Sequence, residues 1–374
     1  MVHEMERRSV TQQPVRFAIV GGGKRSAHFL RVAASNPELF EVTSVNVRSP
    51  AHAAQLKRDW NVATNTTLSQ ACETGAPDFV LVAVPRESAP ELINRVVDLG
   101  QPVLVETPPA PSVQDLSDLW ARVGSSGRVQ VAEQSIFMPG HLARLRAIEK
   151  GIIGKVTSVQ VSSNHEYHAV AVMRSFMQLN FEAVNISAHT FESQLIDPIS
   201  FGGYTGDLAP KTVETTIAIL NWGPAMGLYD FTTNQWFNPL RRPRITIRGS
   251  HGEISGDRII RMADERTTLE SDFVRRSPGP DFNEEGFDLE SISLEGEVLY
   301  RNDFYGSRLS DNELSIAELL RAMGGFARNG GVGPYPLSQG MQDHLIGQVI
   351  LEATKAAGST LSIGAADWAA DQRS

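Results

Sequence analysis

Two histidines, a glutamate and a tyrosine occupy four consecutive positions, His165-Glu166-Tyr167-His168, directly after a stretch that alternates like a β-strand. Imidazole exchanges protons near neutral pH, and a carboxylate or a phenol can share that work. We therefore predict that this cluster, Tyr167 and His168 above all, belongs to a substrate site. His165 and His168 also have a spacing that can bind a metal together with Glu166 or Glu192. A polar loop with partly buried aromatic side chains has the same composition, and we assign no metal.

Another histidine lies in the segment Asn185-Ile-Ser-Ala-His189-Thr-Phe-Glu192. We predict a helix over 183–195. Intervals of four and three residues place Asn185, His189 and Glu192 on one face of such a helix. A single helical histidine is more often a core or surface residue than a catalyst.

Three glycines near the start of the chain predict an anion site. The apolar run Phe17 to Val20 meets Gly21-Gly22-Gly23 and then a segment with helical periodicity. Gly21 suits the tight turn from strand to helix, and Gly23 allows the backbone to approach a pyrophosphate closely. The third glycine of the dinucleotide-binding pattern is replaced by Ser26, which is still small enough for close packing. Lys24 and Arg25 stand at the helix start beside the expected phosphates.

The predicted strands that follow place more residues around the same crevice, because ligands bind beyond the carboxyl ends of parallel strands. After the second strand the sequence reads Arg48-Ser49, with no carboxylate to bond a ribose 2′-hydroxyl. This favours NADP slightly over NAD. Later strand ends contribute Val84, Pro85, Glu106 and Thr107, and Gln134 follows the last strand of the run.

The order of the elements predicts two domains of different class. Strands and helices alternate over 15–133, which is typical of a doubly wound parallel sheet of the Rossmann type, an α/β fold. From 134 to 374 the strands follow one another with few helices, and this favours an α+β domain with a large, mainly antiparallel open sheet. Residues 1–14 are polar and are expected to form a mobile leader. Arg275 to Glu285 is expected to be an irregular surface excursion.

Composition restricts the partners. The chain has 374 residues, 41% hydrophobic content and a formal charge of −9, and no broad basic face is evident. These values are typical of a soluble globular protein and argue against nucleic acid as a partner. No apolar run is long enough for a transmembrane helix. The single cysteine, Cys72, excludes an internal disulfide, so we expect a cytoplasmic protein.

Several landmarks together resemble the Gfo/Idh/MocA oxidoreductases, the group of glucose-fructose oxidoreductase and inositol dehydrogenase. They are Ile19-Val-Gly-Gly-Gly23, Val82-Ala-Val-Pro85, Val105-Glu-Thr-Pro108, Val131-Ala-Glu-Gln-Ser-Ile-Phe-Met-Pro139 and Gly151-Ile-Ile-Gly-Lys155. The resemblance extends over most of 15–360. It implies a nicotinamide cofactor, a substrate site at the end of the first strand of the second domain, and a homo-oligomer, dimer or tetramer, formed through the C-terminal sheet.

The resemblance also suggests catalytic residues, with two departures. His189 stands at the position of the family's catalytic histidine, and Asn185 replaces its aspartate. Thr107 replaces the family's catalytic lysine, and a threonine hydroxyl cannot act as a general acid or base near neutral pH. The resemblance thus implies that His189 transfers the proton, while Asn185, Tyr167 and His168 orient the substrate.

Three functions follow from these features. The preferred one is NAD(P)-dependent oxidation or reduction of a sugar, a polyol or a related small hydroxy or keto compound. The second is a lyase or glycoside-cleaving enzyme that retains its cofactor and shows no net redox change. The third is a regulatory protein that binds cofactor or ligand without catalysis. Trp236 and Phe237 are candidates for a pocket rim, a subunit interface or core packing.

Overall fold

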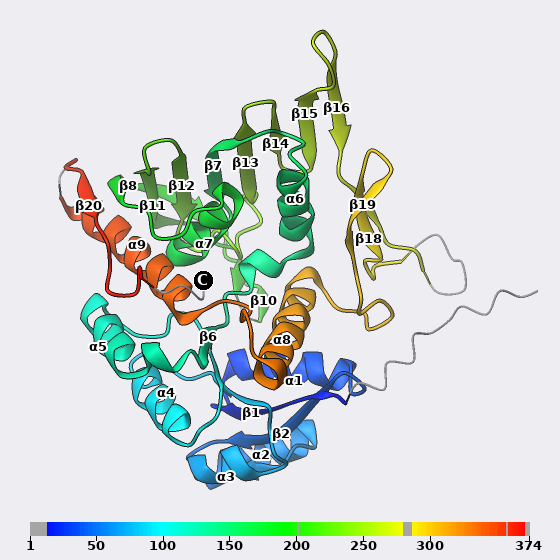
Figure 1. The fold of residues 1–374 in the computed structure, drawn as a ribbon, viewed down its shortest axis with the longest axis vertical. Coiled ribbons are helices and arrows are strands. Elements are labelled where there is room, and N and C mark those ends of the chain that lie inside the picture. Colours follow the sequence, from blue (N-terminus) through cyan, green and yellow to red (C-terminus); the bar gives the residue numbers. More distant parts are fainter. Residues whose placement is uncertain (1–12, 201, 280–285, 357, 371–374) are drawn as a thin grey trace, which may run out of the picture.

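The computed structural model describes residues 13–200, 202–279, 286–356 and 358–370 (Figure 1). The first sheet consists of six parallel strands in the order β3-β2-β1-β4-β5-β6. Its strands are β1 (Val15–Val20), β2 (Phe40–Asn46), β3 (Thr64–Asn65), β4 (Phe79–Val82), β5 (Val103–Val105) and β6 (Val129–Val131). The intervening helices are α1 (Lys24–Ser35), α2 (Pro50–Trp60), α3 (Leu68–Glu73), α4 (Ala89–Asp98) and α5 (Val113–Val123). This strand order is the Rossmann arrangement, as the sequence predicts.

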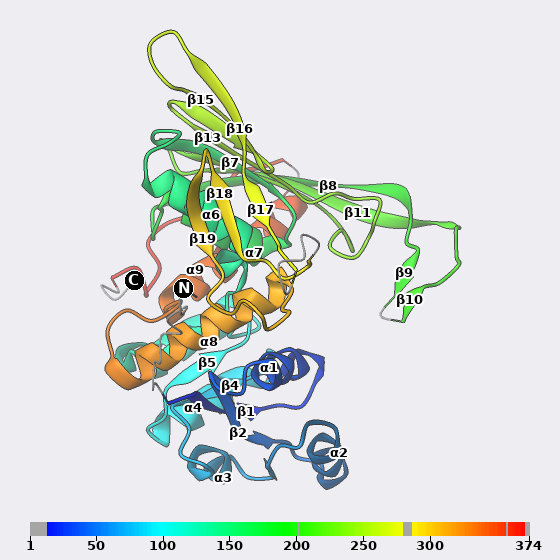
Figure 2. The same cartoon turned by 90° about the vertical axis from the view of Figure 1, so that its right-hand side faces the viewer.

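Both faces of the first sheet are buried, which explains its continuous apolar strands. Phe17 and Ile19 of β1 belong to the same hydrophobic cluster as α1 and the C-terminal helix α8 (Asp311–Asn329). Ala18 and Val20 point the other way, into a cluster with α3, α4 and α5. A helix from the far end of the chain therefore covers one face of the N-terminal sheet (Figure 2).

The second domain contains a nine-stranded sheet in the order β16-β15-β14-β13-β7-β12-β11-β8-β20. Only β7 and β12 run parallel; the other neighbouring strands are antiparallel. The strands are β7 (Val156–Ser162), β8 (Val184–Ile196), β11 (Pro210–Asn221), β12 (Met226–Thr232), β13 (Arg244–Gly249), β14 (Gly252–Ser255), β15 (Arg258–Met262), β16 (Thr268–Asp272) and β20 (Leu361–Ile363). This confirms the predicted, mainly antiparallel sheet.

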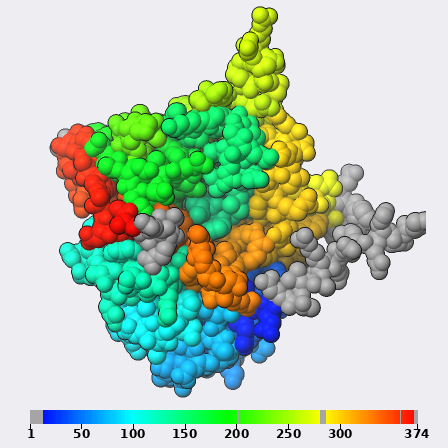
Figure 3. Space-filling model, in the orientation of Figure 1, coloured from blue at the N-terminus to red at the C-terminus, as the bar shows by residue number. Residues whose placement is uncertain are grey.

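Helices cover one face of this sheet and leave the other open. α6 (Pro139–Glu149), α7 (Glu166–Met177) and α9 (Leu337–Lys355) lie between the two sheets (Figures 1 and 2). The opposite face carries exposed apolar side chains, including Phe191, Ile217 and Ile219. In the space-filling view the first domain (blue to cyan) lies below the second, and orange segments run between them (Figure 3).

Smaller elements complete the chain. They are the 3-10 helices η1 (Gly124–Ser126) and η2 (Ser135–Phe137), the two-stranded arm β9 (Ile199–Ser200) and β10 (Gly203–Tyr204), and the three-stranded sheet β17 (Val274–Arg276), β18 (Ser291–Leu294) and β19 (Glu297–Arg301).

None of the helices in the described part of the chain is long and apolar enough to cross a membrane. Except for Gln13 and Pro14, the predicted leader lies outside the described residues. So do 280–285 of the predicted excursion, whose first two residues end β17.

The helix predicted over 183–195 is wrong. Val184–Ile196 is strand β8, which pairs with β11 from Asn185 opposite Asn221 to Ile196 opposite Pro210. The helical spacing of the polar side chains is accidental. A second pattern decides the structure, because Val184, Ile186 and Ala188 are buried at every second position. That alternation is the period of a half-buried strand.

The sequence analysis also missed a helix. The His165-Glu166-Tyr167-His168 cluster, for which no helix was predicted, begins α7, whose N-cap is His165. α7 is held in the core by Arg174, which is 2% exposed and forms an ion pair with Asp343 of α9. Asp343 also accepts a hydrogen bond from the Tyr335 hydroxyl, and the Arg174 guanidinium bonds the carbonyl and side chain of Gln339. These bonds satisfy two buried charges and fix α7 against α9.

Replacing Arg174 tests this anchor. In Arg174→Leu, Asp343 becomes a buried carboxylate without its counter-charge, so the free energy of unfolding should fall by about 3–5 kcal/mol. Urea denaturation followed by circular dichroism measures the loss. Arg122→Ala is the matched control, because its ion pair with Asp98 is half-exposed and should contribute less than about 1 kcal/mol. Equal losses in the two variants would contradict the anchoring role of Arg174.

Candidate active site

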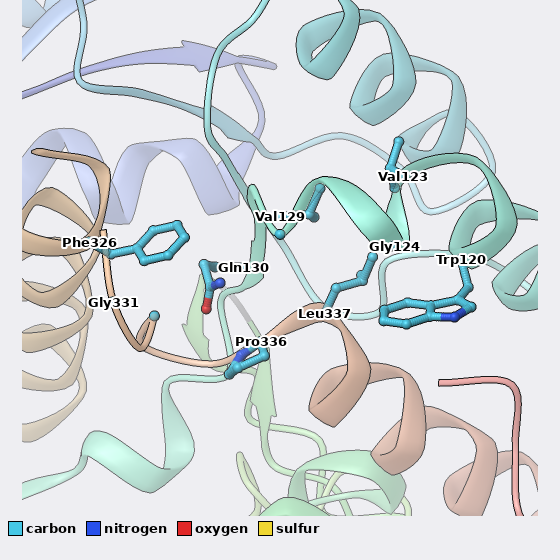
Figure 4. Close-up of a pocket in the computed structure, with 11 residues that line it drawn as sticks. Trp120, Val123, Gly124, Val129, Gln130, Phe326, Gly331, Pro336 and Leu337 are labelled. Carbon is cyan, nitrogen blue, oxygen red and sulfur yellow. The ribbon is translucent and has the colours of Figure 1, made fainter. Parts of the chain in front are cut away.

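A cavity of about 740 Å³ lies at the carboxyl ends of β1, β2, β4 and β5. All the predicted cofactor-binding residues except Gln134 line it: Gly21, Gly23, Lys24, Arg25, Arg48, Ser49, Val84, Pro85, Glu106 and Thr107. A second cavity beside Trp120 and Pro336 measures only about 30 Å³ and adjoins Gln130 (Figure 4). It has room for about one water molecule. The larger crevice is therefore the candidate site.

The glycine turn has the geometry of a phosphate cradle. Gly21 has a φ of +115°, and a Cβ there would lie 2.1 Å from the carbonyl oxygen of Ala83. A Cβ on Gly22 would meet Val47, His52 and Leu56 at 2.8–2.9 Å. Ser26, which replaces the third glycine, is fully buried and donates a hydrogen bond to the Gly21 carbonyl at 3.0 Å. This serine therefore stabilises the turn that the glycines form.

The end of β2 presents a cation. The Ser49 side chain caps α2 by accepting a hydrogen bond from the His52 amide, and Arg48 is exposed at the crevice. Asn46, Val47, Arg48, Ser49 and His52 all line this part of the cavity, and none of them is acidic. This end of the crevice lining therefore carries a cation and no carboxylate.

Arg25 joins the two sides of the crevice. Its guanidinium forms an ion pair with Glu106 (2.7 Å) and donates a hydrogen bond to the Gln134 side chain. Gln134 in turn donates to Asn312 at the start of α8 (2.7 Å). Gln134 therefore contacts the predicted cofactor residues although it does not line the cavity.

Beyond Glu106 the crevice meets the N-terminal turn of α7. The Tyr167 hydroxyl is hydrogen-bonded to the Thr107 side chain. Burial, together with the charges of Glu133, Glu106 and Glu166, raises the pKa of Tyr167 above its ordinary value. The phenol is therefore neutral at physiological pH and can donate a hydrogen bond.

His168 forms a buried acid–base pair with Glu133. Nδ1 of His168 lies 2.6 Å from Oε2 of Glu133. Glu133 is 1% exposed, and its other carboxylate oxygen, Oε1, accepts a hydrogen bond from the Ser135 N–H at 2.9 Å. Burial alone would lower the pKa of His168, but the Glu133 carboxylate outweighs it and raises that pKa. Burial would likewise raise the pKa of Glu133, yet His168 and the Ser135 bonds hold it below its usual value. Both partners therefore favour their charged forms.

Aromatic rings surround this pair. The His165 ring lies 5.0 Å from the His168 ring and 5.1 Å from the Trp236 ring, measured between centroids. Nδ1 of His165 is 2.8 Å from Oε2 of Glu166. The Glu166 backbone, at φ +23°, donates its N–H to the Tyr229 hydroxyl. The α7 N-terminus thus presents polar groups in an aromatic frame.

Asn185 and His189 do not join this site. Both are exposed and alternate with the buried side of β8, so they lie on the open face of the sheet, away from α7. Asn185 accepts a hydrogen bond from Ser362 of β20 (2.6 Å), and His189 lies near Gly358. The two side chains were predicted to share a face of a helix, but this segment is strand β8. Across the described ranges, no three His, Cys, Asp or Glu side chains are placed to hold a metal ion.

Sequence reasoning missed Glu133 and His344. Glu133 follows a buried strand, and the reasoning that selected Glu106 at the end of β5 would also have selected Glu133. His344 of α9 is buried with its ring 5.7 Å from the Tyr167 ring. Burial lowers the pKa of His344 to about 4, so its ring is neutral. No local pattern in the sequence distinguishes this histidine from a core residue.

The comparisons with known proteins agree with this geometry. Residues 15–133 match the GFO_IDH_MocA family model, described as an oxidoreductase family with an NAD-binding Rossmann fold. The sequence of the first domain is therefore similar to the NAD-binding domain of this oxidoreductase family. No curated protein sequence is significantly similar to the chain.

Solved structures of a dehydrogenase and of an oxidoreductase share the fold of both domains. Levoglucosan dehydrogenase in complex with NADH and levoglucosan is 18% identical, with a TM-score of 0.66 over 94% of this chain and 100% of that chain. An oxidoreductase from Agrobacterium radiobacter in complex with NAD⁺, L-tartaric acid and magnesium is 14% identical. Its TM-score is 0.66, over 93% and 98% of the two chains. These similarities establish the two-domain fold.

Two glycine substitutions test the cradle. Gly21→Ala forces an alanine into positive φ and against the Ala83 carbonyl, which should lower the free energy of unfolding by about 1–3 kcal/mol and weaken NADH binding. Gly23→Ala is the matched control, because a Cβ there meets no atom within 4 Å. Thermal unfolding of the protein without cofactor separates the two variants. If both were equally stable, the steric account of Gly21 would be wrong.

Proposed function

We propose that this protein is an NAD(P)-dependent oxidoreductase acting on a sugar, a polyol or a related small hydroxy or keto compound. The observation that carries the proposal is the Glu133–His168 pair, which is joined to the crevice by contacts. The His168 ring lies 4.4 Å from the Tyr167 ring, and Tyr167 is hydrogen-bonded to Thr107 of the crevice lining. Acid–base groups are needed there because hydride transfer to or from a carbinol carbon requires a proton on its oxygen.

The crevice fits a dinucleotide by its own residues. The turn requires glycine at Gly21 and Gly22, because a Cβ at either position would clash with neighbouring atoms. Positive charge at the start of α1 comes from Lys24 and Arg25. Backbone amides at a helix start bind a pyrophosphate well. When bound, the nicotinamide supplies or accepts the hydride. Arg25, held by Glu106, and Thr107 would border its ring.

His168 is the proposed proton carrier. In carbonyl reduction its imidazolium donates a proton to the substrate oxygen, and in oxidation the neutral ring accepts the hydroxyl proton. Glu133 holds Nδ1, which leaves Nε2 for the substrate. The neutral Tyr167 phenol donates a hydrogen bond to the same oxygen, and Thr107 orients the phenol. A catalytic lysine at position 107 is then unnecessary. We assign no catalytic role to Asn185 or His189.

Two further proposals concern the cofactor and the assembly. Arg48 and the absence of a carboxylate after β2 support a preference for NADP over NAD. Exposed apolar side chains on the open face of the nine-stranded sheet, among them Phe191 and Ile219, support a homo-oligomer formed through that face. Size-exclusion chromatography with light scattering measures the assembly.

Substituting His168 tests the mechanism. His168→Ala should reduce kcat at least about a hundredfold, because general acid–base catalysis contributes that much. Binding of NADH and NADPH, measured by fluorescence titration, should remain. His189→Ala is the control and should retain turnover within about twofold. Normal turnover of His168→Ala across a panel of sugars and polyols would reject the assignment.

The pH dependence tests Glu133 separately. Carbonyl reduction needs protonated His168, so its rate should fall as pH rises through the raised pKa of this histidine. In Glu133→Gln the charge that raises this pKa is lost while burial remains, so the midpoint should move to lower pH. Glu87→Gln, at an exposed site, should leave the midpoint in place. An unchanged midpoint in Glu133→Gln would show that Glu133 does not tune the proton donor.

Arg48 is tested by binding. NADPH should bind more tightly than NADH, and Arg48→Ala should weaken NADPH binding at least about tenfold while changing NADH binding little, because a charged hydrogen bond to the 2′-phosphate is lost. Arg58→Ala, exposed on α2 and outside the crevice, provides the control. Tighter binding of NADH by the unsubstituted protein would assign the protein to NAD.

A further inference from the structure

A row of aromatic rings runs from the core of the second domain to His165 at the start of α7. Tyr229 and Phe231 lie on the buried face of β12, the face that packs on the helices. Their rings are stacked at 6.3 Å, and the Phe231 ring is stacked on Trp236 at 5.4 Å with an interplanar angle of 20°. Trp236 therefore belongs to the side of the sheet that faces the crevice, and not to its open face.

The Trp236 ring is both fixed and accessible. Gln235 is buried and ties the loop to the end of β7, because its side chain donates to the Ser162 carbonyl at 2.7 Å and accepts the Thr232 amide at 3.0 Å. One side of the indole is occupied by Phe231, yet Trp236 remains 47% exposed. A large aromatic residue that is held in place while presenting apolar surface to solvent is typical of a ligand platform.

Trp236 lies one ring beyond the proposed catalytic histidine. The His165 ring contacts both residues, at 5.1 Å from the Trp236 ring and 5.0 Å from the His168 ring. The two outer rings are therefore no more than about 10 Å apart. Trp236 therefore lies within the reach of a second sugar ring linked to one that is bound at His168.

Polar groups accompany the platform. His165 and Glu166 form a hydrogen-bonded pair whose side chains are each 29% exposed. Glu166 keeps a positive φ, and the Tyr229 hydroxyl and the close approach of Gly347 hold it there. A strained backbone that presents a carboxylate at a site mouth indicates a functional constraint. Carboxylate and imidazole groups beside an apolar face match a sugar ring, which has hydroxyls at its edge and C–H bonds on its face.

We propose that Trp236, with His165 and Glu166, forms an outer subsite for the second ring of a disaccharide or glycoside. The ring that is oxidised or reduced lies at His168, and the neighbouring ring stacks on Trp236, where His165 and Glu166 bond its hydroxyls. The inference rests on the proposed function and narrows its substrate to sugars of at least two rings. The redox step is unchanged: the carbinol carbon loses hydride to the oxidised cofactor, and the hydroxyl proton passes to His168.

Titration calorimetry of the NADH-saturated protein tests the subsite without requiring turnover. The probes are maltose, cellobiose, lactose and sucrose, with glucose and galactose as single-ring counterparts. At least one disaccharide should bind about tenfold or more tightly than its component monosaccharide, as expected for a buried aromatic contact. Trp236→Ala should remove this ratio, and Trp236→Phe should keep part of it. Phe287→Ala, at an exposed aromatic residue before β18, should leave it unchanged.

The outcomes separate the two proposals. If no disaccharide binds more tightly than its monosaccharide, or if Trp236→Ala leaves the ratio intact, the outer subsite is rejected while the oxidoreductase proposal stands on NADH binding and His168. If neither NADH nor NADPH binds to the folded protein, the oxidoreductase proposal itself is rejected. Should Trp236→Ala fold poorly, a reduced ratio in Trp236→Phe supports the subsite and an unchanged ratio rejects it. A change in oligomeric state of either variant would assign Trp236 to an interface and overturn the subsite.

Discussion

The contact between Glu133 and His168 is the interaction on which the rest of the site depends. Glu133 follows the last strand of the first sheet, and His168 lies in the first turn of α7 in the second domain. A buried carboxylate and a buried imidazolium are each costly alone, so neither side can tolerate the loss of the other. The pair therefore fixes the distance between the cofactor crevice and the α7 N-terminus. The core anchors of α7 hold the far end of the same helix.

The threonine at position 107 is consistent with this arrangement. A lysine ammonium at the end of β5 would add another cation beside Arg25 and the protonated His168. In this chain the position carries a neutral hydroxyl that bonds Tyr167, and the charge at the site comes from elements on both sides of the crevice. In the proposed mechanism the proton carrier lies on the helix that faces this strand end.

Much of this could be predicted from the sequence, for physical reasons that also explain the errors. Buried parallel strands are continuous apolar runs, so the first sheet and most of its crevice residues followed from the pattern and the strand ends. The prediction for β8 failed because its polar residues have the spacing of a helix face. The structure follows the weaker apolar alternation of Val184, Ile186 and Ala188. The Glu133–His168 pair could not be found by spacing, because its members are 35 residues apart and meet only through the docking of two domains.

The C-terminal helix that covers the first sheet has a consequence for the autonomy of the nucleotide-binding domain. Val15 of β1 packs so closely on Gly324 of α8 that a Cβ there would lie 2.4 Å from the valine side chain, and Arg328 pairs with Asp78. The segment before α9 also caps the edge strand β6, whose Val131 amide donates to the Tyr335 carbonyl. A fragment ending near residue 133 would thus expose an apolar flank and an unpaired strand edge, which are the features that drive aggregation. The cofactor domain is contiguous as a sequence pattern but discontinuous as a folding unit, so it cannot be excised, exchanged or fused as a simple N-terminal module.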